Sequence, residues 1–206
     1  MKLFINDKLI ETQDEAIEKP QTVLDWTNAF IASGRVPAGE IVTNILIDGK
    51  DHDSEAIEKD ETVYDFSGIG EVKLITKALG EILRESVSEA KKSCRSLSED
   101  SRKIADLFRS QKLADANDAY SMLVGDIQEV LGHLAVLQDY ILNIVENIEH
   151  LRFEEIWKHF EDIARETITY QEDSDWVMLA DLLEYEFAEI FSDFENYFSE
   201  VQDRMQ

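Results

Sequence analysis

Several residue types that organise other classes of protein are scarce in this chain of 206 residues. Its one cysteine, Cys94, excludes an intramolecular disulfide framework. Two prolines and eight glycines favour long uninterrupted elements over a loop-rich enzyme. No apolar run reaches the ~18 residues of a membrane-spanning helix, and the first residues lack the apolar core of a signal peptide. We therefore expect a cytoplasmic protein.

Basic residues are also scarce, since 20 Lys and Arg stand against 45 Asp and Glu and give a formal net charge of −25. Such a chain repels phosphate backbones and anionic membrane surfaces, so we expect neither nucleic acid nor a membrane as a partner. Hydrophobic residues still make up 44% of the chain, too many for disorder. The net charge is −8 over residues 1–77, +2 over 78–112 and −19 over 113–206. The acidic segment either neutralises the basic one internally or forms a surface for a basic partner.

The first 77 residues carry the patterns of strands. Two short apolar runs flank Asn6-Asp7 and predict a β-hairpin. A helical spacing of apolar residues follows between Thr22, a potential cap, and Gly34, a potential stop. Two β-branched runs, at 40–50 and 71–77, predict further strands, with a short helical turn at TVYDF between them.

This order carries a resemblance to a known fold. MKLFIND, NILIDGK, TVYDFSGIG and EVKLITK resemble the corresponding segments of ubiquitin-like domains in order and spacing. The resemblance implies a β-grasp, in which a sheet folds over one helix, and a protein-binding role rather than catalysis. Lys77 continues directly into KALGEILRESV, so the free Gly-Gly end that conjugation and sulfur transfer require is missing here.

Strand alternation assigns residues to the two faces of the expected sheet. The side chains predicted to face the helix are Leu3, Ile5, Ile45, Ile47, Val72 and Leu74. Phe4, Leu46 and Ile75 should then point outward. Ubiquitin-like domains commonly bind partners through this outer face, so the resemblance makes these three residues partner-binding candidates. Alternatively, the outer face docks against the protein's own helices.

After residue 77 the apolar spacing is helical. We expect helices over about 78–109, 112–149, 152–170 and 175–203, packed as an antiparallel bundle. The S-x-x-E capping pattern from Ser96 to Glu99 could interrupt the first of them. The expected fold class is therefore α+β, with a ubiquitin-like β-grasp at 1–77 followed by an acidic bundle of about four long helices at 78–206.

The bundle offers few candidates for chemistry. The histidines His133, His150 and His159 each have a glutamate four residues earlier, but the Glu-x-x-His motif of dimetal carboxylate proteins is absent. Glu–His pairs at that spacing are ordinary on helix surfaces. Cys94 falls on an apolar stripe, as an inert core thiol would. Glycine-rich phosphate loops are also absent. We expect no catalytic residue, cofactor or metal.

Aromatic residues crowd the stretch from Trp157 to Phe198. They indicate either core packing or a groove for an amphipathic helix of another protein. Tyr185, Tyr197 and Phe198 fit a single inner face least well, so they join the partner-binding candidates.

Two stretches, LFRSQKLADANDAYSMLVGDIQEVL and DWVMLADLLEYEF, also resemble segments of bacterial helical proteins of flagellar gene clusters, a group similar to secretion chaperones. We expect a non-enzymatic protein-interaction module, an adaptor or chaperone for an amphipathic, helical and basic segment of a bacterial protein. A carboxylate–histidine metalloenzyme and a structural homo-oligomer such as a homodimer remain alternatives. The repeated EAIEK segments at 15–19 and 55–59 are interpreted as local caps.

Overall fold

The computed structural model describes residues 2–10, 23–52, 68–146, 148 and 152–205. The chain divides into two compact units, Met1–Ile82 and Leu83–Gln206, called here the sheet unit and the helical unit. The boundary between the two units lies five residues after the predicted domain boundary at residue 77. The difference arises because the first turn of the long helix belongs with the sheet. The predicted turn at TVYDF and both EAIEK segments lie outside the described residues.

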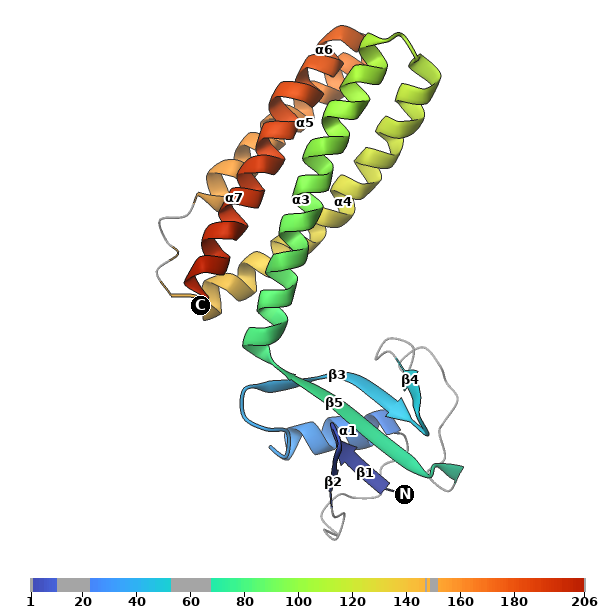
Figure 1. Cartoon of the computed structure of the whole chain (residues 1–206), viewed down its shortest axis with the longest axis vertical. Coiled ribbons are helices and arrows are strands. Elements are labelled where there is room, and N and C mark those ends of the chain that lie inside the picture. Colours follow the sequence, from blue (N-terminus) through green and yellow to red (C-terminus); the bar gives the residue numbers. More distant parts are fainter. Residues whose placement is uncertain (1, 11–22, 53–67, 147, 149–151, 206) are drawn as a thin grey trace. The chain divides into compact units, whose positions relative to one another are not determined.

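The sheet unit contains a mixed five-stranded sheet with the strand order β2-β1-β5-β3-β4 (Figure 1). The strands are β1 (Lys2–Ile5), β2 (Lys8–Ile10), β3 (Glu40–Ile47), β4 (Lys50–His52) and β5 (Glu71–Ala78). Strands β1 and β5 pair in parallel, whereas the other neighbouring pairs are antiparallel. The chain turns from β3 to β4 at Asp48 and Gly49, whose φ angles of 50° and 79° suit a two-residue hairpin.

One face of the sheet is covered by helix α1 (Val23–Ala32), whose Phe30 is fully buried against the strands. The six residues predicted to face the helix are all buried, which confirms the predicted alternation. The first turn of the next helix joins this unit through the Leu79 amide, which donates to the Gly39 carbonyl at 2.9 Å.

The helical unit consists of long helices packed side by side (Figure 1). They are α3 (Leu79–Arg109), α4 (Leu113–Ile144), α5 (Phe153–Glu172), α6 (Trp176–Asp181), the π-helical segment η2 (Leu182–Phe187) and α7 (Ala188–Arg204). The last three follow one another without a break. Asp175 caps α6 by accepting a hydrogen bond from the Met178 amide at 3.1 Å.

Two expectations about these helices were wrong. The Ser96–Glu99 pattern does not interrupt α3: the Ser96 hydroxyl donates to the Asp100 carboxylate at 3.2 Å, and the buried Ser98 donates to the Ala188 carbonyl of α7. Helix α4 ends at Ile144, five residues before the expected end. In the described segments, no helix combines the length and the apolar character that crossing a membrane requires.

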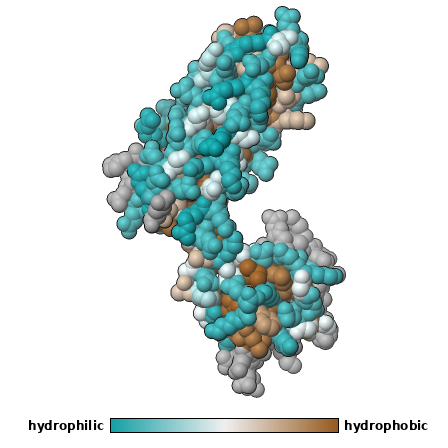
Figure 2. Space-filling model, in the orientation of Figure 1, coloured by the Kyte–Doolittle hydropathy of each residue, from teal (hydrophilic) through white to brown (hydrophobic). Residues whose placement is uncertain are grey.

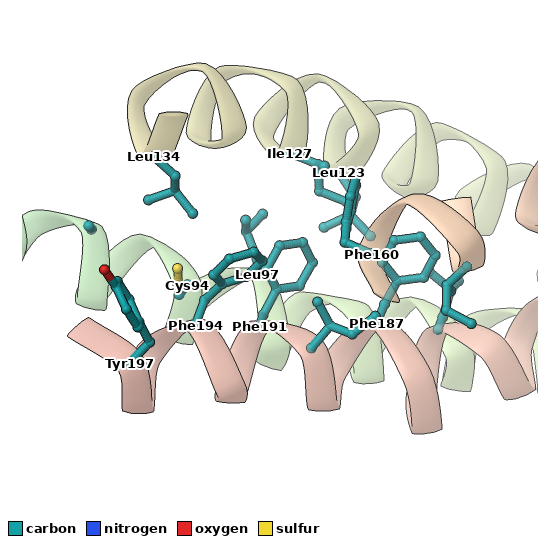
Figure 3. Close-up of a cluster of buried hydrophobic side chains, with 14 of the residues drawn as sticks. Cys94, Leu97, Leu123, Ile127, Leu134, Phe160, Phe187, Phe191, Phe194 and Tyr197 are labelled. Atoms are coloured by element: carbon teal, nitrogen blue, oxygen red, sulfur yellow. The ribbon is translucent and has the colours of Figure 1, made fainter. Parts of the chain in front are cut away.

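The core of the helical unit is built largely from aromatic and leucine side chains. Phe191, Phe194 and Phe198 of α7 are fully buried, and Phe160 of α5 packs between Phe187 and Phe191. Leu123, Ile127 and Leu134 of α4 close the core from the opposite side (Figure 3). Core packing therefore accounts for most of the aromatic residues between Trp157 and Phe198.

Candidate functional site

The uncovered face of the sheet carries a continuous row of side chains. Strand pairing aligns five residues across all five strands, in the order Leu9, Phe4, Lys73, Leu46 and Asp51. Residues paired in this way project to the same side of a sheet. Phe4 and Leu46 therefore flank Lys73 on the face opposite α1.

The three outward candidates on this face, Phe4, Leu46 and Ile75, are half-buried, and neighbouring Leu9 is 53% exposed. The Lys73 ammonium lies 2.6 Å from an Asp7 carboxylate oxygen. Figure 2 shows hydrophobic side chains gathered on the visible face of the sheet unit, ringed by hydrophilic ones. The outer sheet face thus carries partly exposed apolar side chains around Lys73, whose charge is paired with Asp7.

Three of the seven basic residues of α3 form hydrogen bonds to the last helices, and two of these three form ion pairs with them. Arg95 donates from Nε to Glu195 of α7 at 3.0 Å, and Lys91 donates to Gln202 at 2.7 Å. Arg109 binds Asp181 at 2.7 Å and also binds Glu184, and these two hydrogen bonds raise the pKa of its guanidinium. Internal neutralisation, the first of the two charge interpretations, therefore applies between α3 and the segment from α6 to α7.

Helix α4 takes no part in this neutralisation. Its five carboxylates are Asp115, Asp118, Asp126, Glu129 and Asp139, all of them exposed. The helix contains neither Lys nor Arg. Within the described ranges, none of the five carboxylates forms an ion pair. Helix α4 therefore presents uncompensated negative charge to solvent.

The same helix also exposes apolar side chains away from the core. Met122, Val136 and Tyr140 are 72%, 58% and 51% exposed, and they lie opposite the buried stripe of α4. Gly125 and Gly132 lie between Met122 and Val136 on this side, and a Cβ added to either would meet nothing within 4 Å. A glycine inside a helix costs about 0.5–1 kcal/mol relative to alanine. We call Met122, Gly125, Glu129, Gly132, Val136 and Tyr140 the outward α4 face.

The outward α4 face was not among the predicted sites, although the sequence contains signals of it. Met122, Val136 and Tyr140 are apolar residues that fall outside the buried stripe of their helix. The absence of Lys and Arg between Lys112 and Arg152 was visible only as part of a segment charge. A helix that is apolar on two sides indicates a second packing partner.

The π-helical segment η2 holds Tyr185, the most exposed aromatic candidate at 59%. The Arg109 guanidinium lies 5.7 Å from the centre of its ring, within the range of a cation–π contact. Arg109 therefore links the end of α3 to Asp181 of α6 and to Glu184 and Tyr185 of η2. Segments of π-helix are rare and often coincide with functional sites.

The other two aromatic candidates require a correction. Phe198 is fully buried and Tyr197 is 4% exposed, so both lie on the inner face that they were expected to fit least well. The Tyr197 hydroxyl donates to Gln138 of α4, which gives its one polar atom a partner inside the unit. Burial raises the pKa of Tyr197 to about 12, against the opposing effect of this hydrogen bond. Neither side chain is available to a partner in this structure.

The residues considered for chemistry are separated. His159 approaches Glu186 of η2 at 3.6 Å, whereas Glu155 approaches Arg152. Among the residues that the structure describes, no group of three His, Cys, Asp or Glu side chains could hold a metal ion. His150 lies outside the described residues. Cys94 is fully buried (Figure 3), and burial, with a smaller contribution from Glu195, raises the pKa of its thiol to about 12.

The helical unit matches a known family model. Residues 85–197 match the model of the family described as "Domain of unknown function (DUF8042)". The match covers more than half of the chain, so the chain belongs to this family. It begins within α3 and ends within α7, and it therefore includes the outward α4 face. No curated protein and no solved structure matches the chain.

Proposed function

We propose that this member of the DUF8042 family is a non-enzymatic protein-interaction module, an adaptor or chaperone for an amphipathic helical segment of a bacterial protein. Its sheet unit would be a ubiquitin-like β-grasp, and its helical unit a four-helix bundle. The strand order β2-β1-β5-β3-β4, with β1 parallel to β5 and α1 on one face, supports the first assignment.

The observation that carries the proposal is the apolar row on the outer sheet face. Phe4 and Leu46 flank Lys73 in register, and Ile75 lies two residues further along β5 on the same face. Side chains on the opposite face are buried by α1, whereas these three keep part of their surface in solvent within the sheet unit. Partly exposed apolar groups gathered on one face suit contact with an apolar surface of another protein.

The test is a triple substitution on this face. Phe4→Asp, Leu46→Asp and Ile75→Asp together should abolish co-purification of the partner from the native host while leaving the circular dichroism spectrum unchanged. Ile31→Asp on α1 is the matched control, because Ile31 is 42% exposed on the helical side of the sheet. The partner should remain bound to this control.

Either of two results would contradict the proposal. Retention of every co-purifying protein by the folded triple variant would remove the outer sheet face from recognition. Loss of the circular dichroism signal would show instead that the face is internal to the protein.

A further inference from the structure

We propose that the outward α4 face is the docking site for a basic amphipathic helix of a second protein. This inference rests on the proposed function and names both the surface and the chemistry of the partner. The face is separate from the outer sheet face, so the two can be tested independently.

The spacing of the outward α4 face matches the geometry of helix packing. Met122, Gly125, Glu129, Gly132 and Val136 follow one another at alternating steps of three and four residues. Positions at this spacing form one seam along a helix and receive the side chains of a neighbouring helix. Tyr140 extends the seam by a further turn.

The two glycines favour a helix as the occupant. Open space surrounds the position that a Cβ would occupy at Gly125 and Gly132. A neighbouring helix can therefore approach the α4 backbone closely at two points one heptad apart, between the larger side chains of Met122 and Val136. An irregular loop has no such repeat, so two glycines seven residues apart would not improve its contact with α4.

The charge of α4 indicates whether the outward α4 face binds a second copy of the chain or a different protein. In a two-fold dimer, each α4 would meet its own copy, and five unpaired carboxylates would face five more. No Lys or Arg of α4 could relieve that repulsion. A helix with Lys or Arg beside its apolar stripe instead places cations next to Glu129, inside the seam, and next to Asp126 and Asp139 at its edges.

The experiment uses the full chain and a synthetic probe. The probe is a helical peptide of about 20 residues, with leucine at three–four spacing and lysine at the flanking positions. Its control has the same composition in a scrambled order, which keeps the charge but removes the apolar stripe. Binding is measured by isothermal titration calorimetry at physiological ionic strength. We expect the amphipathic peptide to bind at least about tenfold more tightly than the scrambled one.

Two variants place the binding on α4. Val136→Asp should weaken binding of the amphipathic peptide by at least about tenfold. Ile168→Asp on α5 should not, although Ile168 is as exposed as Val136, at 58%. Gly125→Gln with Gly132→Gln should also weaken binding, because two bulky side chains fill the gaps. Glutamine is a better helix former than glycine, so this double variant should keep its melting temperature or raise it.

Three results would overturn the inference. These are equal binding of the two peptides, equal loss in the Val136→Asp and Ile168→Asp variants, and a dimer in light scattering that Val136→Asp dissociates. Failure of this inference can be distinguished from failure of the proposed function. If the amphipathic peptide is ignored while the outer-sheet-face variant loses its partner, the inference is wrong and the proposed function stands.

Discussion

At the scale of single residues, Cys94 and Tyr197 share one physical situation. Both side chains carry a weakly acidic proton into an apolar core, and burial raises both pKa values to about 12 from ordinary values of 9.0 and 10.0. In the unfolded chain the two groups ionise at their ordinary values. Between pH 9 and 12 the folded state therefore binds more protons than the unfolded state.

Alkaline pH should consequently destabilise the protein. The free energy of unfolding is expected to be independent of these two groups below pH 9 and to fall as the pH rises toward 12, because each retained proton contributes up to ~1.4 kcal/mol per pH unit. Urea denaturation across this range measures the slope. Cys94→Ala and Tyr197→Phe should each flatten it.

A control separates titration from loss of packing. Leu97→Ala, which empties part of the same core, should lower stability by about 2–5 kcal/mol at every pH and leave the slope unchanged. If the Cys94→Ala and Tyr197→Phe curves simply run parallel to the original protein, these two protons do not control alkaline stability.

At the scale of elements, the glycines of α4 give a direct prediction. Gly125→Ala and Gly132→Ala should each raise the free energy of unfolding by about 0.5–1 kcal/mol, because a methyl group fits without contact and alanine favours the helix. Chemical denaturation provides the measurement. A loss of stability in either variant would mean that the side of α4 carrying that glycine is covered in solution.

The π-helical segment η2 has an explanation in the spacing of the core. One line of buried residues here follows at steps of four, as Leu179, Leu183, Phe187 and Phe191. Each such step overshoots a turn of α-helix by ~40°, so the stripe would rotate away from the core. The wider turns of η2 absorb this rotation and keep all four side chains buried.

Deletion of Tyr185 tests this explanation. Removing one exposed residue shortens one step to three, which an ordinary α-helix accommodates. The variant should fold with a loss of no more than about 1 kcal/mol, some of it from the cation–π contact with Arg109. Deletion of Glu99, an exposed residue of the regular helix α3, should cost more than about 4 kcal/mol, because it turns half of that helix out of register. Thermal denaturation of both variants distinguishes the cases.

The elements were predictable from sequence to different degrees. Period-two alternation located the strands and the inward set from Leu3 to Leu74, because one buried face enforces that pattern. The possible break at the Ser96–Glu99 pattern did not occur, and Ser98 within it donates to a carbonyl of α7 that only the tertiary structure supplies. The burial of Tyr197 and Phe198 was not predicted. A helical wheel assumes the same number of residues in every turn, so it does not show the wider turns of η2.

At the scale of the whole molecule, the net charge of −25 should weaken folding at low ionic strength. Added salt screens the repulsion among the α4 carboxylates and their acidic neighbours, so the melting temperature should rise between low and physiological ionic strength. Replacing Asp118, Asp126 and Asp139 with Asn should raise the melting temperature at low salt and reduce its salt dependence. A melting temperature that falls with salt would show that ion pairs such as Arg95–Glu195 dominate instead.

The lack of Lys and Arg in α4 also decides which chemical methods can report on it. Trypsin has no cleavage site from Leu113 until Arg152, and reagents that cross-link amines find no side chain to modify on this helix. A partner seated on α4 would therefore leave no lysine cross-link to the helix, however tightly it bound. Carboxylate-directed coupling, which can reach Asp126, Glu129 and Asp139, is the labelling chemistry suited to this surface.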